Sequence, residues 1–130
     1  MDIRQKQRLV VEALEDIKGR DIEVFNTARL PSMFERVVIA SGESNRQVRA
    51  LADNVQERVR ENGARVYGVE GEQSGEWVLV DLGDVVVHIM HPTVREFYNL
   101  EEIWGGKRVR FKTTKAAKPR AKAPRRRAKR

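Results

Sequence analysis

Residues 37–63 read VVIASGESNRQVRALADNVQERVRENG, and this stretch predicts a buried strand followed by a helix. Val37 to Ala40 form a short β-branched apolar run, which is typical of a central strand covered on both faces. Ser44 and Gln47 have the spacing of a capping box, in which a hydroxyl and a side-chain carbonyl each accept from a free amide. Gly63 is expected to close the helix that follows this cap. Before Gly63, apolar residues repeat at helical spacing, namely Val48, Leu51, Ala52, Val55 and Val59.

The segment before this unit predicts one helix and one strand. Residues 3–18 place Val10, Leu14 and Ile17 on one helical face, and Gly19 is expected to end the helix in the left-handed conformation. Residues 21–26 alternate polar and apolar side chains, as a half-buried strand does. Pro31 and Ser32 are expected in a loop.

The segment after the central helix predicts a hairpin and a short helix. Residues 65–69 form a possible short strand, and 70–76 a polar loop. Residues 77–82 and 85–90 are two β-rich runs separated by Gly-Asp, which indicates a hairpin with a primed turn. Pro92 suits the first turn of a helix. The apolar side of one or two short helical turns would come from Val94, Phe97, Tyr98, Leu100, Ile103 and Trp104.

These elements predict an α/β fold. Its mixed sheet is expected to have five strands, flanked by the longer helices. A chain of 130 residues has room for one domain with a modest core.

Charge divides the chain into two parts. The segment 107–130 holds 13 of the 26 Lys and Arg and none of the 19 Asp and Glu, which leaves residues 1–106 with a net charge of −6. From Lys115 onward the sequence contains only Lys, Arg, Ala and Pro, and it cannot bury enough apolar surface to offset its ordering entropy. We therefore expect a folded domain at 1–106 and a disordered basic tail at 107–130.

The composition also bears on location. The chain has no cysteine, which is compatible with a reducing cytoplasm. Acidic residues occur early in the chain, and no apolar run of the kind found in a secretory signal follows the start. No apolar stretch approaches the length of about 20 residues that a membrane span needs. The expectation is a cytoplasmic protein without membrane contact.

Three motifs carry a resemblance to a known family. ASGESNRQVRALADNV (residues 40–55), WVLVDLGDVVVHIM (77–90) and HPTVREFYNLEEIW (91–104) resemble, in register, the strand-to-helix signature, the hairpin and the C-terminal helical segment of the ribosomal silencing factors. The similarity covers nearly all of residues 1–106. Glu35-Arg36 replace the Asp-Tyr that the family usually carries before the second strand, and the tail lies outside the common family core.

The resemblance implies a fold and a function. The implied fold is an α/β domain related in shape to nucleotidyltransferases. The implied function is translational repression: binding of the large ribosomal subunit through ribosomal protein L-fourteen and steric blocking of small-subunit joining when nutrients are short.

The residues themselves argue against an enzyme. His88 and His91 are the only histidines, and their spacing along a strand would send them to opposite faces, so no metal site is expected. Asp81 and Asp84 flank a tight turn and lack the alternation that would place both on one strand face for two-metal chemistry. Ser44 is better explained as a helix cap than as a phosphate ligand or a nucleophile. We expect no catalytic residue and no cofactor.

Candidate contact residues come from the motif segments and from the tail. Trp, Tyr and Arg are frequent binding anchors, although Trp77, Phe97 and Trp104 suit a core equally well. The partner-binding candidates are Trp77, Asp81, His88, Arg95, Tyr98 and Trp104, and Asp81, Asp84 and Glu70 could form an acidic patch for a basic ribosomal surface. The candidates for contact with ribosomal RNA are Lys115, Lys118, Arg120, Lys122, Arg125, Arg126, Arg127, Lys129 and Arg130.

Two other classes of function stay open at this point. The tail alone would make the chain a general RNA-binding protein, and the implied fold would suit a nucleotidyltransferase-like enzyme. The Val10-Leu14-Ile17 face could also form a homodimer.

Overall fold

The computed structural model describes residues 1–28, 34–99 and 107–108 and confirms the α/β fold. The predicted loop at Pro31 and Ser32 lies outside these residues, as do Leu100, Ile103, Trp104 and the tail from residue 109. None of the described helices is long and apolar enough to cross a membrane. The elements in chain order are α1 (Ile3–Asp16), β1 (Arg20–Asn26), β2 (Arg36–Ser41), α2 (Asn45–Glu61), β3 (Gly68–Glu70), β4 (Trp77–Asp81), β5 (Val85–Met90), α3 (Pro92–Tyr98) and β6 (Lys107–Arg108).

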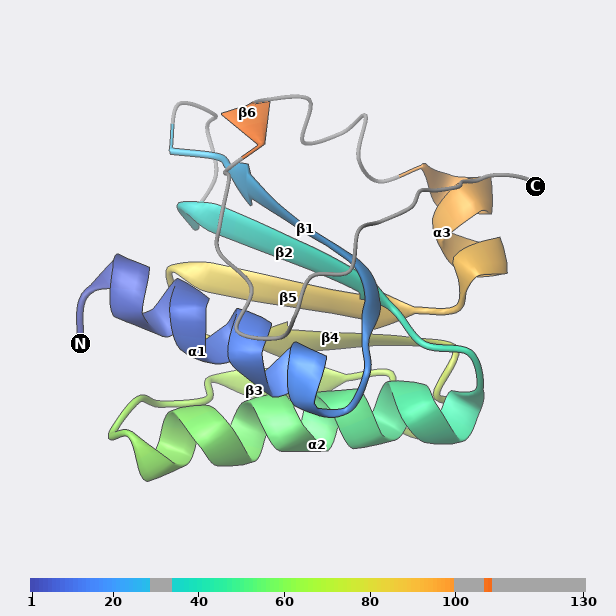
Figure 1. Ribbon diagram of the computed structural model, residues 1–130, viewed down its shortest axis with the longest axis horizontal. Coiled ribbons are helices and arrows are strands. Elements are labelled where there is room, and N and C mark those ends of the chain that lie inside the picture. The colour runs from blue at the N-terminus through green and yellow to red at the C-terminus, as the bar shows by residue number, and fades with distance from the viewer. Residues whose placement is uncertain (29–33, 100–106, 109–130) are drawn as a thin grey trace.

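The sheet is mixed, as predicted, with the strand order β3-β4-β5-β2-β1-β6 (Figure 1). Among the described strands, only β2 and β5 pair in parallel, and the other neighbours are antiparallel. The five predicted strands are present, although the third lies at Gly68–Glu70 rather than at residues 65–69. The two-residue β6 pairs with the end of β1 and extends the sheet beyond residue 106, the predicted end of the folded domain.

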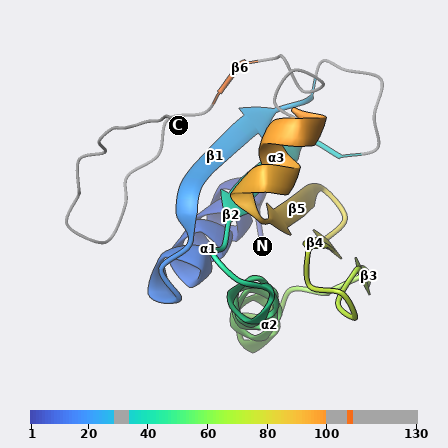
Figure 2. The same cartoon turned by 90° about the vertical axis from the view of Figure 1, so that its right-hand side faces the viewer.

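Helices lie on both faces of the sheet, with α1 and α2 on one face and α3 on the other (Figure 2). On one face α1 and α2 pack on the strands around the main core, which includes Val38, Leu51 and Ile89. On the other face a smaller cluster gathers Phe25, Val37, Ile39 and Met90, with Phe34, Trp77 and Val94 against it. Val94 belongs to α3, so α3 packs on the face opposite the long helices. The expectation that the Val37–Ala40 strand is covered on both faces is confirmed.

Helix α1 ends at Asp16, two residues before its predicted end, and the predicted left-handed position of Gly19 is wrong by one residue. Lys18, with φ of 63°, takes the left-handed position of a Schellman motif, because Lys18 N donates to Glu15 O and Gly19 N donates to Leu14 O. Gly19 serves another purpose: a Cβ there would lie 3.0 Å from Leu14 O and 3.1 Å from Leu51 Cδ2. The chain needs glycine at this position because helix α2 passes close to the backbone.

The Val10-Leu14-Ile17 face is not free to form a homodimer. Val10 and Leu14 are fully buried, and Ile17 packs against the same core. That hypothesis is wrong because the apolar stripe of α1 faces the sheet and α2.

The cap of α2 is confirmed, with one difference. Gln47 N donates to Ser44 Oγ at 3.0 Å, but Gln47 Oε1 accepts from Glu43 N rather than from Ser44 N. The Gln47 amide also donates to Ile17 O and Lys18 O. The Gln47 side chain therefore links the carbonyls after α1 to the residues that precede α2.

The β4–β5 hairpin is confirmed. Leu82 N donates to Val85 O, and Gly83 has φ of 93° in the two-residue turn, as a primed turn requires. Asp84 in this turn forms a 2.7 Å ion pair with Lys6 of α1, and its carbonyl accepts from the amides of Glu35 and Arg36. The turn thus holds together α1 and the start of β2.

Adjacent substitutions at the end of α1 are expected to act in opposite directions. Lys18→Gly relieves the left-handed strain and should raise the free energy of unfolding by about 0.5–1 kcal/mol. Gly19→Ala forces a methyl group against Leu14 O and Leu51 and should lower it by about 1–3 kcal/mol. Urea denaturation measures both, and equal effects of the same sign would contradict this account of the helix end.

Candidate partner-binding site

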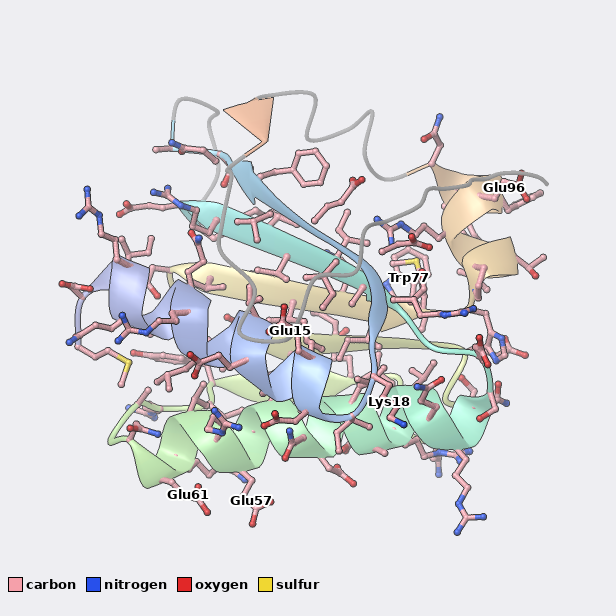
Figure 3. All side chains as sticks on the ribbon, in the orientation of Figure 1. Glu15, Lys18, Glu57, Glu61, Trp77 and Glu96 are labelled. Carbon is pink, nitrogen blue, oxygen red and sulfur yellow. The ribbon has the colours of Figure 1, made fainter. Side chains whose placement is uncertain are left out.

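Three aromatic side chains form a partly exposed group where α3 meets the start of β4. The rings of Trp77 and Tyr98 lie 5.0 Å apart, and the rings of Tyr98 and Phe97 meet edge to face at 4.9 Å. Tyr98 is 52% exposed and Phe97 is 77% exposed, whereas Trp77 is half-buried. We call Trp77, Phe97 and Tyr98 the aromatic surface. Figure 3 shows Trp77 at the end of the sheet beside α3.

The position of Trp77 follows from strand register. Trp77 pairs with Met90 across the hairpin, and His88 lies two residues before Met90 on the same face of β5. Trp77 Nε1 donates to His88 Nδ1 at 3.0 Å, and the two rings lie 5.9 Å apart. The indole of Trp77 is therefore held by its hydrogen bond to His88 and by contact with the ring of Tyr98.

His88 supports the aromatic surface from below. It is 8% exposed, and burial lowers its pKa from 6.5 to about 4. The ring is neutral near pH 7, with Nδ1 as the acceptor for Trp77, so the ring proton lies on Nε2. The structure thus places this predicted contact residue beneath Trp77 rather than at the surface.

Arg95 is committed to contacts within the protein. It is 8% exposed and donates to Asp21 O at 2.7 Å and Ser41 Oγ at 3.0 Å, and it pairs with Glu23 at 3.5 Å. These partners belong to β1 and β2. The guanidinium therefore fixes α3 to the sheet and orients the helix that presents Phe97 and Tyr98.

The acidic candidates are partly engaged by the hairpin turn. Asp81 Oδ1 accepts from Gly83 N at 2.8 Å, and Asp84 pairs with Lys6. Glu70 is exposed on β3 at the sheet edge. The exposed carboxylates that border the aromatic surface along the chain are instead Glu76, before Trp77, and Glu96, within α3.

The sequence left Phe97 open between core and interface, and Phe97 was not among the partner-binding candidates. A seven-residue helix turns by about 100° per residue, so adjacent residues such as Phe97 and Tyr98 cannot both face inward. That adjacency was the available signal for an exposed aromatic group. Trp104 and the nine tail candidates lie outside the described residues.

The described part of the chain offers no group of three or more His, Cys, Asp or Glu side chains that could hold a metal ion. His91 contacts Asn45 of α2 through Nε2, and His88 contacts Trp77. The two histidines therefore serve different parts of the structure.

The fold defines a small α/β domain with a mixed sheet, and comparison with known proteins gives its family. The family model described as "Ribosomal silencing factor during starvation" matches residues 1–130. The chain is 53% identical to a ribosomal silencing factor of Chromobacterium violaceum over 119 residues, which are 92% of this chain and 97% of that protein. A crystal structure of a protein from the same species superposes with a TM-score of 0.80 at 52% identity, over 89% of this chain and 97% of that one.

A more distant relative is the mouse "mitochondrial assembly of ribosomal large subunit protein 1", which is 30% identical over 99 residues, 74% of this chain and 43% of that protein. The chain belongs to the ribosomal silencing factor family.

The buried His88 predicts a specific dependence of stability on pH. Its pKa is depressed in the folded state, so the unfolded chain binds a proton first as pH falls from about 6.5 to about 4. Folding stability is therefore full above pH 6.5 and should be about 2 kcal/mol lower at pH 5 through this group alone.

His88→Asn tests this prediction, because asparagine does not titrate. The Oδ1 atom of the new asparagine can accept the hydrogen bond from Trp77 Nε1 that His88 Nδ1 accepts in the parent. The variant should lose about 2 kcal/mol less than the parent between pH 7.5 and pH 5, as measured by urea denaturation at both values. All other titratable groups are the same in the two proteins, so their contributions cancel. Equal pH dependence in the two proteins would show that His88 does not titrate as stated.

Proposed function

We propose that this chain is a translational repressor that binds the large ribosomal subunit through ribosomal protein L-fourteen and sterically blocks joining of the small subunit under nutrient limitation. Family membership carries the ribosome-associated, regulatory part of this proposal. The name of the mouse relative, which refers to the large subunit, supports that subunit as the target.

The aromatic surface supports a protein as the direct contact. Exposed aromatic rings combine large apolar area with few rotatable bonds, and interface anchors are enriched in Trp and Tyr. Glu76 and Glu96 border the rings, and residues 1–106 carry a net charge of −6, which suits a basic ribosomal protein. Of the partner-binding candidates, Trp77 and Tyr98 are therefore proposed as contacts, with Phe97 added. His88 and Arg95 are proposed to act beneath them.

Truncation of the aromatic surface should weaken binding more than folding. Trp77→Ala and Tyr98→Ala should each reduce affinity for purified large subunits by about 30-fold, equivalent to about 2 kcal/mol. Phe97→Ala should also weaken binding, and its ring is too exposed for its loss to unfold the protein. Co-sedimentation with large subunits measures affinity, and thermal melts measure folding.

Tyr67→Ala is the matched control, because Tyr67 is 60% exposed but lies before β3, away from α3. It should bind as the parent does. If all three aromatic variants bind as well as Tyr67→Ala, the aromatic surface is not the docking site.

Sucrose-gradient analysis of the two subunits, with and without the protein, tests the block of subunit joining.

We propose that the basic tail adds contact with ribosomal RNA but not specificity. Removing residues 109–130 keeps β6 and deletes 11 of the 13 Lys and Arg of the predicted tail. The full chain should bind large subunits and an unrelated RNA more tightly than the truncated chain at low salt. This increment should fade as salt rises, because phosphate neutralisation releases counterions, with a log–log slope near −0.9 per phosphate on duplex DNA and less on single strands.

Titration of both proteins on both targets at several salt concentrations separates the two functional classes. Residues 1–108 should retain salt-resistant binding to large subunits. Loss of all binding on truncation would instead favour a general RNA-binding protein. If the full chain and residues 1–108 have the same salt dependence of binding, the tail does not contact RNA.

A further inference from the structure

Asn45, the first residue of α2, contacts two separate segments with one side chain. Its Nδ2 donates to Ser74 O at 2.9 Å, and its Oδ1 faces His91 Nε2 within hydrogen-bond distance. Ser44 already caps the helix, so the Asn45 amide is not needed for capping. Because a carbonyl accepts only, the amide nitrogen must face Ser74, and His91 Nε2 must then carry the proton it donates to Oδ1.

The first of these segments leads directly to Trp77. One turn along α2, Arg49 donates to Glu72 O, Gln73 O and Ser74 O at 2.9, 3.1 and 3.3 Å. Gly75 follows with φ of 74°, and a Cβ there would lie 3.0 Å from Asn45 O and 3.1 Å from the Arg49 guanidinium. The loop of residues 71–76 thus rests on the first turn of α2, and its end sets where β4 and Trp77 begin.

The second segment leads directly to Phe97 and Tyr98. His91 precedes α3 and makes no side-chain cap for it. Its amide donates to Glu76 O at 3.2 Å, which links it to the residue before Trp77. A helix of seven residues is marginal by itself, so the placement of α3 depends on its tethers, among them Arg95 and His91.

We propose that Asn45 is a positioning residue for the aromatic surface. It holds the loop before Trp77 and the start of α3 at a fixed separation, so that the Trp77 and Tyr98 rings stay in contact in their tilted arrangement. The role requires a donor and an acceptor on one short planar group, which asparagine supplies and neither alanine nor aspartate does. The inference deepens the proposed function and rests on it for the consequence in binding.

The fluorescence of Trp77 reports the surroundings of its ring, once the other of the two tryptophans is replaced by Trp104→Phe. In that parent, Asn45→Ala and His91→Ala should each shift Trp77 emission and increase its quenching by acrylamide. His91→Gln should leave both unchanged, because its amide nitrogen can donate where Nε2 does. Arg46→Ala is the matched control, since Arg46 is exposed in the same helical turn.

Binding to purified large subunits is measured on the same proteins. Asn45→Ala and His91→Ala should bind about tenfold more weakly, equivalent to about 1.4 kcal/mol, whereas His91→Gln and Arg46→Ala should bind as the parent does. The double variant Asn45→Ala/His91→Ala should be no weaker than Asn45→Ala, because both changes remove the same contact.

Unchanged Trp77 fluorescence in Asn45→Ala, or equal effects of His91→Gln and His91→Ala, would overturn the proposal. If Asn45→Ala does not fold, the two His91 variants decide the same question. A failure of the proposed function looks different: Trp77→Ala would then bind like the parent while the fluorescence of Asn45→Ala still shifted.

Discussion

The parallel pairing of β2 with β5 is the constraint on which the rest of this structure depends. All six residues of β2 pair with the six of β5, from Arg36↔Val85 to Ser41↔Met90, and every residue of β5 is buried. Parallel neighbours cannot be joined by a tight turn, so the chain between them must cross over. Here the crossover contains α2, β3 and β4, and α2 covers one face of the strands it connects.

This pairing also decides where the candidate site forms. Parallel strands end at the same edge of a sheet, so the helices that follow β2 and β5 begin side by side. The start of α2 therefore lies beside His91, and the Asn45–His91 contact is a direct result of topology. The hairpin brings Trp77 to the same edge, because Trp77 pairs with Met90 at the end of β5. An aromatic group built from residues 77 and 98 needs both relationships.

Two buried polar side chains, Arg95 and His88, stabilise this edge of the sheet from the interior. Arg95 keeps its charge in the interior through an ion pair with Glu23, the Ser41 hydroxyl and the Asp21 carbonyl. His88 is kept neutral by burial, which lowers its pKa to about 4, and uses one nitrogen to hold the Trp77 indole. Both residues would be costly to bury without these partners. The exposed rings above them thus rest on residues that are themselves held in place, as the proposed docking role requires.

The sequence by itself determined most of the strands and helices of this protein, because their signals are local: apolar periodicity in α2, the Ser44 cap, the Gly-Asp turn and Pro92 at the start of α3. The short strands β3 and β6 lack such a signal, because they depend on pairing with β4 and β1. The sequence also determined the family, through motifs that are continuous in the chain. Only the tertiary structure decided how far each aromatic ring is exposed, because the exposure of Phe97 and Trp77 depends on what packs on them. Likewise, position 19 requires glycine because Leu51 of α2 lies close to its backbone, and Arg95 points inward because Asp21, Glu23 and Ser41 lie there. Contacts between residues 20 to 80 positions apart leave no local pattern, so packing alone could assign these roles.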